Sequence, residues 1–171
     1  PGARCDVNSL EYSYQFSEEL QQDWSWSERY SSQPEILSYA KHVSERFDLR
    51  RDIQFETRVI QLEYDENLDV WHGQTDRGDK FTSRILIMAT GVLSKSNTPQ
   101  FEGLNQFEGQ LFHTAQWPHT EVDFSGKDVG VIGTGSSAIQ LIPIVADQAK
   151  SLTVFQRTAN FSIPAHNSDM D

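Results

Sequence analysis

The chain has 171 residues, a formal net charge of -11 and a pI of about 4.8. An acidic chain is repelled by nucleic-acid phosphates and by anionic membranes, so we expect neither as a partner. No apolar run is long enough to span a bilayer, and the five histidines show no metal-ligand spacing, so we expect no membrane segment and no metal.

The length allows one domain or parts of two. The chain begins with Pro1-Gly2 rather than methionine, and we interpret it as a fragment. Its single cysteine, Cys5, cannot form an internal disulfide, which favours the reducing cytoplasm.

Two helices are predicted near the beginning of the chain. Ser17-Glu18-Glu19 resembles a helix start, and Trp24 and Trp26 are expected to pack in a core rather than stack on a ligand. A longer helix is predicted over Pro34–Phe47, because apolar residues recur on one face at helical spacing. These residues are Ile36, Ala40, Val43 and Phe47.

A small antiparallel β-meander is predicted between residues 53 and 90. Alternating apolar residues from Ile53 to Tyr64 indicate its first strand, and turn signals at residues 65–67 and 76–79 bracket the second, around Val70-Trp71. The last strand, Ile85–Ala89, is apolar on both faces and is expected to enter a central sheet. Polar residues and prolines after Val92 are typical of a linker between domains.

The strongest motif runs from Val129 to Ala138. A β-branched run ends at Gly133, a tight turn follows through Thr134 and Gly135, and a helical pattern begins at Ser136-Ser137. This strand, turn and helix form the dinucleotide-binding fingerprint, in which the first-turn amides face a pyrophosphate. The alternative is a strand-to-helix turn with no ligand. We expect the helix, residues 136–149, to bury Ile139, Ile142, Ala146 and Ala149.

The next predicted strand, residues 151–155, indicates which dinucleotide binds. About 20 residues beyond the glycines an acidic residue would accept a hydrogen bond from the ribose of NAD. Here Arg157 and Thr158 stand instead, and a guanidinium suits the 2′-phosphate of NADP. The alternative is a solvated arginine at a strand end.

A longer motif points to a family. Residues 107–118 follow the pattern F-x-G-x-x-x-H-x-x-x-W-P, which resembles the fingerprint of type I Baeyer–Villiger monooxygenases. Related flavin N- and S-oxygenases usually end this pattern differently, so Trp117-Pro118 favours the first family. Residues 1–6, 89–91, 133–138 and 155–158 are similar to segments of that family in the same order. The resemblance covers residues 1–167 of the chain and a middle portion of a full family member.

The resemblance implies an α/β fold with two nested, doubly wound (Rossmann-like) dinucleotide-binding domains, both incomplete here. Residues 1–91 would belong to the FAD-binding domain, 92–102 to a linker, and 103–171 to the first part of the NADP-binding domain. The FAD-binding glycine loop would precede Pro1, and a catalytic arginine would follow Asp171. These residues alone are therefore not expected to retain FAD.

The resemblance also implies an activity and its residues. NADPH would reduce FAD, and an oxygen atom of O₂ would be inserted next to a ketone carbonyl. Asp6 matches an acidic residue that orients the catalytic arginine. The other flavin-side matches are Arg4, Cys5, Tyr12 and Val59. The NADP-side matches are Gly133, Thr134, Gly135, Ser136, Ser137 and Ala138 for the pyrophosphate, and Arg157 and Thr158 for the 2′-phosphate.

No serine or cysteine nucleophile is evidently paired with His113, which argues against a role as a base. The resemblance places His113 beside the interdomain connection and so implies a conformational role for it, together with Trp117. Two alternatives to the Baeyer–Villiger reaction stay open. One is a flavin oxygenase that acts on nitrogen or sulfur, and the other is a non-catalytic NADP-binding remnant.

Overall fold

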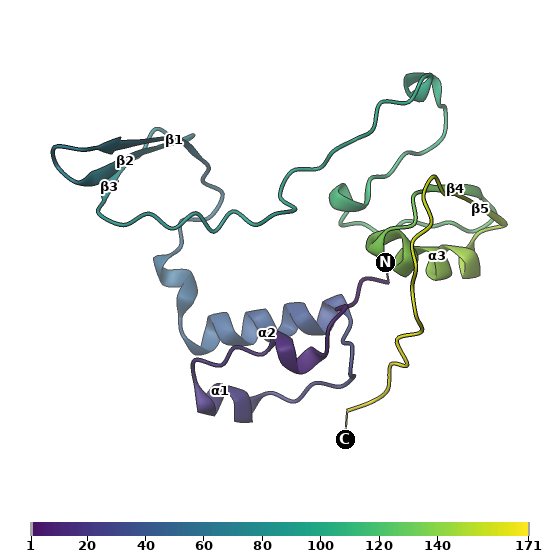
Figure 1. Ribbon diagram of the computed structural model, residues 1–171, viewed down its shortest axis with the longest axis horizontal. Coiled ribbons are helices and arrows are strands. Elements are labelled where there is room, and N and C mark those ends of the chain that lie inside the picture. Colours follow the sequence, from purple (N-terminus) through teal and green to yellow (C-terminus); the bar gives the residue numbers. More distant parts are fainter. Residues whose placement is uncertain (1, 171) are drawn as a thin grey trace. The chain divides into compact units, whose positions relative to one another are not determined.

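The computed structural model describes residues 2–170, which fall into two compact units (Figure 1). The first unit combines Pro1–Phe47 with Thr98–Asp171, and the second is Asp48–Asn97. Besides the helices and strands described below, residues 2–170 contain four short 3₁₀ helices. They are η1 (Ser9–Tyr12), η2 (Leu49–Asp52), η3 (Leu104–Gln106) and η4 (Thr114–Gln116).

The first unit begins with two helices, α1 (Glu18–Asp23) and α2 (Gln33–Arg46). Ser17 caps α1 by accepting a hydrogen bond from the Leu20 amide, and Pro34 lies in the first turn of α2, where no amide proton is needed. Both predicted helices are confirmed. Their shared core consists of Leu20, Trp26, Tyr39 and Val43, against which Trp24 and Ile36 pack.

The predicted face of α2 is partly wrong. Val43 is buried and Ile36 packs on the core, but Tyr39 is buried where Ala40 was expected, and Phe47 lies at the surface. The Tyr39 ring stacks on Tyr14, and its hydroxyl accepts a hydrogen bond from the Tyr14 amide at 2.8 Å. This contact satisfies the polar end of a buried aromatic side chain, which helical spacing alone could not predict.

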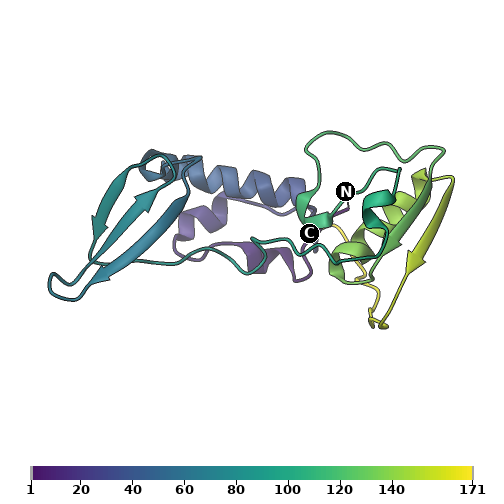
Figure 2. The ribbon, with the colours of Figure 1, turned by 90° about the horizontal axis from the view of Figure 1, so that it is seen from above.

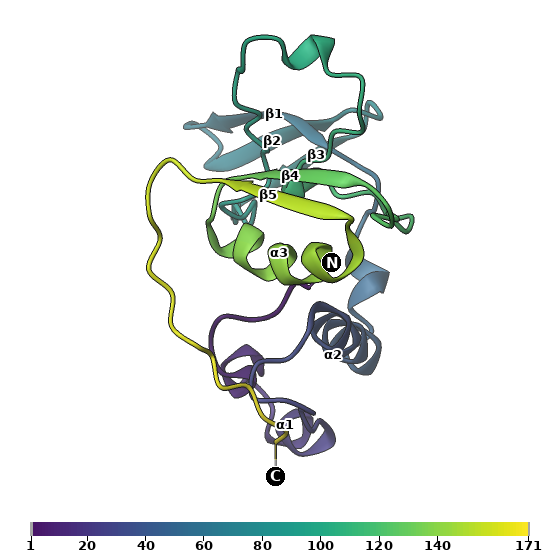
Figure 3. The same cartoon turned by 90° about the vertical axis from the view of Figure 1, so that its right-hand side faces the viewer.

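The later part of the first unit is a β-α-β segment, as predicted. Strand β4 (Asp128–Ile132) pairs in parallel with β5 (Ser151–Phe155), and α3 (Ser136–Gln148) connects them. Figure 3 shows α3 lying along one face of this strand pair. Phe124, Leu141 and Val145 form the core between helix and strands, with Trp117, Val122 and Leu152 packed around them.

The predicted buried face of α3 is wrong. Ala138, Leu141 and Val145 are buried, whereas Ile139 and Ala146 are exposed, and Ile142 and Ala149 are only partly buried. Apolar residues lie almost all around this helix, so their spacing does not identify the face that meets the sheet. The strands against which the helix packs select that face.

The second unit contains the predicted meander (Figure 2). Strands β1 (Val59–Asp65), β2 (Val70–Thr75) and β3 (Lys80–Ser83) pair antiparallel in that order. Gly73 of β2 pairs with Phe81 of β3, and a side chain at this glycine would overlap the Phe81 ring. The glycine is therefore needed for the ring to pack across the sheet.

Two predicted strand segments of the second unit are wrong. Residues 53–57 form a loop after η2, and β1 begins only at Val59. Residues 85–89 are extended but belong to no strand, and Ile85 and Ile87 are 76% and 83% exposed. A strand needs a partner for its backbone hydrogen bonds, and none of the described residues supplies one beside this apolar segment.

The last described residues run beside the segment that precedes α2. The Arg29 amide donates to the Ser168 carbonyl at 2.8 Å, and the Met170 amide donates to that of Ser27 at 3.0 Å. None of the helices in residues 2–170 combines the length and the apolarity needed to cross a membrane.

Candidate functional site

The turn between β4 and α3 leaves backbone amides open at the start of a long helix. Gly133 has a φ of +105°, and its amide donates to the Phe155 carbonyl at 2.9 Å. Gly135 is the N-cap of α3, and the first amide of the helix to find an intrahelical acceptor is that of Ile139, at 3.0 Å from the Gly135 carbonyl. The amides of residues 136–138 therefore keep their donors for another acceptor.

The surroundings of this turn favour an anion. No side chain within residues 2–170 caps α3, and its first turn contains no acidic residue. A Cβ built on Gly133 or Gly135 would meet no atom within 4 Å, so the space in front of the turn is open. Open amides at the positive end of a helix dipole fit a phosphate group, and a pyrophosphate can approach the glycines closely.

Two amide side chains that the sequence analysis did not select contact this turn. Gln156 Nε2 lies 2.9 Å and Asn160 Nδ2 lies 3.0 Å from the Thr134 hydroxyl oxygen. Both residues follow β5 and flank the Arg157-Thr158 pair. Their position beside that pair was the available signal, but amide side chains at a strand end have no distinctive spacing.

Arg157 and Thr158 lie where the sequence placed them, just after β5. Ile132, the last residue of β4, pairs with Phe155, and Arg157 is two residues beyond Phe155. Both side chains are exposed, and within residues 2–170 no hydrogen bond or ion pair engages the Arg157 guanidinium. The structure thus brings a free cation close to the glycine turn.

The N-terminal loop around residues 3–5 is held by backbone hydrogen bonds and by a side chain of α3. The Cys5 amide donates to the Ser31 carbonyl at 3.1 Å, and the Gln33 amide donates to that of Ala3 at 2.8 Å. The side chain of Gln140, on α3, bonds the backbone of Arg4 twice, accepting at 3.1 Å and donating at 3.2 Å. The helix that follows the glycine turn therefore also holds the proposed flavin-side loop.

The Arg4 side chain reaches an acidic residue missed by the sequence analysis. Its guanidinium donates to the Glu28 carboxylate at 2.5 Å and to the Tyr30 carbonyl at 3.0 Å. The same carboxylate oxygen accepts a hydrogen bond from the Asn167 amide. Glu28 therefore connects the beginning of the described chain to its end.

Ser9 and Ser31 form a buried polar pair beneath this loop. Both residues are 0% exposed, and their hydroxyl oxygens are 2.9 Å apart. The Ser9 hydroxyl also lies 2.7 Å from the Glu28 carbonyl and accepts from the Ser31 amide at 2.8 Å. Serines are common on protein surfaces, so no feature of the sequence indicates this burial.

The other flavin-side candidates differ in their surroundings. Cys5 is buried, with its sulfur 3.8 Å from the Ser9 hydroxyl oxygen, whereas Asp6 and Tyr12 are exposed. Partial burial raises the pKa of the Tyr12 phenol, and the charges of Asp6 and Cys5 raise it further. Tyr12 is therefore a neutral hydrogen-bond donor at neutral pH. Val59 belongs to the second unit, where it begins β1 and is exposed.

His113 and Trp117 have structural contacts. His113 Nδ1 accepts from the Ala115 amide at 3.1 Å and so caps η4. This bond places the proton of the neutral ring on Nε2. Trp117 packs against Phe112 and Phe124 and adjoins the core beneath α3. The family motif is thereby attached to the β-α-β segment.

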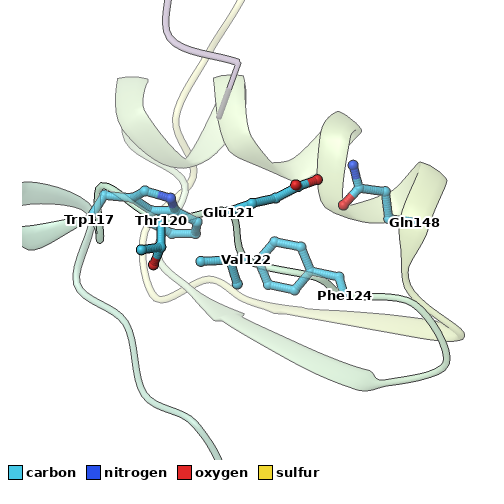
Figure 4. A pocket seen from close by; sticks show the side chains of 6 residues that line it. All are labelled: Trp117, Thr120, Glu121, Val122, Phe124 and Gln148. Atoms are coloured by element: carbon cyan, nitrogen blue, oxygen red, sulfur yellow. The ribbon is translucent and has the colours of Figure 1, made fainter.

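A pocket of about 230 Å³ lies beside this motif. Figure 4 shows the side chains around it, which are Trp117, Thr120, Glu121, Val122, Phe124 and Gln148. Gln148 ends α3, whereas the glycine turn precedes the helix. The pocket therefore lies at the opposite end of α3 from the candidate phosphate site. Within residues 2–170, no group of three or more His, Cys, Asp or Glu side chains is placed to hold a metal ion.

A protein-family comparison matches most of the chain. The family described as pyridine nucleotide-disulphide oxidoreductase matches residues 7–170. Two curated relatives are a Baeyer-Villiger monooxygenase of Pseudooceanicola batsensis, 43% identical over all of this chain and 31% of its own length, and a phenazine N-monooxygenase of Lysobacter antibioticus, 45% identical over 96% of this chain and 30% of its own length. The resemblance found in the sequence is confirmed.

Solved structures agree with this result and confirm the α/β fold class. A steroid monooxygenase bound to NADP is 61% identical, with a TM-score of 0.95 over all of this chain and 33% of its own. The OTEMO complex with FAD and NADP is 44% identical, with a TM-score of 0.92 over the same shares. The chain thus spans about a third of the length of the proteins it matches.

Proposed function

Because the chain belongs to the pyridine nucleotide-disulphide oxidoreductase family, we propose that it forms part of an FAD- and NADPH-dependent monooxygenase of the Baeyer–Villiger type. Such an enzyme inserts one oxygen atom of O₂ next to the carbonyl of a small ketone and gives an ester or lactone. The observation that carries the proposal is the glycine turn, where open amides and the nearby Arg157 fit NADP.

In this proposal the chain's own residues bind and orient the cofactors. The amides of Ser136, Ser137 and Ala138 and the glycines Gly133 and Gly135 would hold the pyrophosphate, and Arg157 and Thr158 would hold the 2′-phosphate. When bound, the nicotinamide and the flavin supply the redox chemistry.

On the flavin side we assign the roles that the family resemblance implies. Asp6 orients a catalytic arginine that lies outside this chain, Tyr12 contacts the flavin, and Arg4 and Cys5 belong to the same loop. Val59 contributes a backbone contact to the FAD adenine. The hydrogen bonds of Arg4 to Glu28 and Gln140 support such a positioning role, because a site of this kind needs residues that hold it in place.

For the domains we propose that residues 1–91 belong to an FAD-binding domain, 92–102 to a linker and 103–171 to an NADP-binding domain. The exposed side chains of Val92 and Leu93 and the polar composition of the following residues support the linker. Contacts within the chain also group Pro1–Phe47 with Thr98–Asp171. We therefore expect the two domains to meet through Arg4 and Gln140.

His113 and Trp117 are proposed to act in conformational change near this linker. For its location we propose the cytoplasm.

The full-length gene product tests this function. We expect the purified protein to bind FAD and to oxidise NADPH when a steroid ketone or a cyclic ketone is added, with an ester or lactone as product. The steroid is included because a steroid monooxygenase is 61% identical. NADPH oxidation without oxygenated product would contradict the proposal.

A second candidate function is oxygenation of nitrogen, because a phenazine N-monooxygenase is as similar as the Baeyer-Villiger relative. A phenazine assayed beside the ketones separates the two activities by the mass and position of the added oxygen. NADP⁺ binding with no product from any of these substrates would instead favour a non-catalytic NADP-binding remnant.

A further inference from the structure

Two side-chain amides donate hydrogen bonds to the hydroxyl of Thr134. Gln156 Nε2 and Asn160 Nδ2 lie 2.9 Å and 3.0 Å from its oxygen, and both amide groups come from the segment that follows β5. Thr134 itself lies between the two glycines of the turn. Three side chains thus connect the glycine turn to the segment that contains Arg157.

This arrangement determines the direction of the third hydrogen bond. An amide nitrogen only donates, and a hydroxyl oxygen has two lone pairs, so the two amides occupy the acceptor capacity of Thr134. Its single proton remains for another acceptor, and within residues 2–170 no acceptor is hydrogen-bonded to it. A phosphate oxygen is an acceptor of the required kind, and the space before the turn is open.

We propose that Gln156 and Asn160 are positioning residues that fix the Thr134 hydroxyl as a hydrogen-bond donor to a phosphate of NADP. The proposal rests on the proposed function of the glycine turn. The two amides act through Thr134 and not on the cofactor itself. Because Gln156 directly precedes Arg157, the same segment orients the donor for one phosphate and carries the cation for the other.

The chemical identity of the two amides follows from this role. A glutamate at position 156 would accept a hydrogen bond from the Thr134 hydroxyl and would place a negative charge beside the phosphates. A glutamine of nearly the same shape donates to the oxygen and leaves the proton for the ligand. Gln156→Glu is therefore expected to weaken binding more than Gln156→Met, which only removes the donor.

The test is a double-mutant cycle in the full-length gene product, with NADP⁺ binding measured by calorimetry. Thr134→Val removes the hydroxyl and keeps the shape, and is expected to raise the Kd about tenfold, as for a lost bond to a charged group. Gln156→Met and Asn160→Leu are each expected to raise it about threefold. In the Thr134→Val background neither is expected to have a further effect.

The controls separate positioning from folding. Thr134→Ser is expected to restore most of the affinity, and Gln148→Met, at the far end of α3, is expected to leave it unchanged. FAD content and ligand-free melting temperature should stay at the wild-type values. If Thr134→Val does not fold, Thr134→Ala provides the second background.

Two results would count against different claims. If wild-type protein binds NADP⁺ but Gln156→Met weakens binding equally with and without the hydroxyl, the amides do not act through Thr134 and the inference is overturned. If wild-type protein does not bind NADP⁺ at all, the proposed function fails first.

Discussion

The glycine turn and the N-terminal loop are built in different ways, although both belong to the first unit. The turn is made by a strand, two glycines and a helix that follow one another within residues 128–148, and its donors are backbone amides. The loop is held by side chains that come from distant parts of the chain. Gln140 and Asn167 are more than 130 residues from Arg4 and Glu28.

This difference predicts how each region responds to substitution. A site built on backbone amides fails when the backbone conformation is lost. A loop held by side chains loses stability in steps, as each contact is removed. The first region should therefore show large effects on ligand binding, and the second should show smaller effects on the free energy of unfolding.

The largest effect is expected for Gly133→Ala. A φ of +105° is strained for any residue with a Cβ, so the turn should change shape and the Kd for NADP⁺ should rise at least about 100-fold. Gly78→Ala is the matched control, because Gly78 also has a positive φ and open space around it but lies in the β2–β3 turn. Each variant should lose about 1–2 kcal/mol of stability. Equal loss of NADP⁺ binding in both would contradict the site.

The next effect is expected for Arg157→Ala. Removal of the guanidinium should raise the Kd for NADP⁺ about 30-fold and leave that for NAD⁺ nearly unchanged, because only NADP carries the 2′-phosphate. Calorimetry with both nucleotides measures the ratio. Arg84→Ala, at an exposed arginine of the second unit, should change neither affinity. A parallel loss for both nucleotides would show that Arg157 does not recognise the 2′-phosphate.

For the loop, Ser9→Ala is expected to lower the free energy of unfolding by about 2 kcal/mol, since it leaves the buried Ser31 amide without its hydrogen-bond acceptor. The Glu28 carbonyl loses one of its donors but still accepts from the Ser31 hydroxyl at 3.2 Å. Ser38→Ala is the control, because the exposed Ser38 hydroxyl donates only to the Pro34 carbonyl and its loss should be within about 0.5 kcal/mol. Chemical denaturation measures both. Equal losses would mean that the buried pair does not support the loop.

The same contrast explains what could be predicted from the sequence. The strand, turn and helix around Gly133 were predicted because backbone conformation follows from neighbouring residues, and the Arg157 position follows from the spacing of one β-α-β unit. The meander and α2 were predicted for the same reason. Local periodicity and turn residues determine them.

The remaining features depend on partners distant in sequence. Nothing near Ser9 or Glu28 in the sequence indicates that they contact Ser31, Arg4 and Asn167. The role of the Gln156 and Asn160 amides becomes visible only in the structure, where they contact Thr134. The wrong prediction of the buried face of α3 has the same cause, since contact with the sheet decides which of several apolar stripes is buried. Residues 85–89 show the opposite case. Their composition predicts a buried strand, but strand formation requires a neighbouring strand.

The smallest effect is expected from pH at Glu35, which supports the segment before α2. Its carboxylate accepts hydrogen bonds from the Ser27 amide at 2.7 Å and the Ser27 hydroxyl at 2.8 Å. Partial burial alone would raise the pKa of Glu35, but hydrogen bonds from Ser31 and Ser27 lower it below the ordinary value of 4.5. A carboxyl whose pKa is lower in the folded state than in the unfolded state stabilises the fold above the unfolded value.

That contribution is complete above about pH 4.5 and is lost as the pH falls through the folded-state pKa. In Glu35→Gln the side chain no longer titrates, so its stability should decline less steeply than that of the wild type over this acidic range. Glu45→Gln, at an exposed position of α2, should keep the wild-type slope. Denaturation at a series of pH values measures the slopes. If Glu35→Gln follows the wild-type slope, the Ser27 hydrogen bonds do not favour the charged carboxylate.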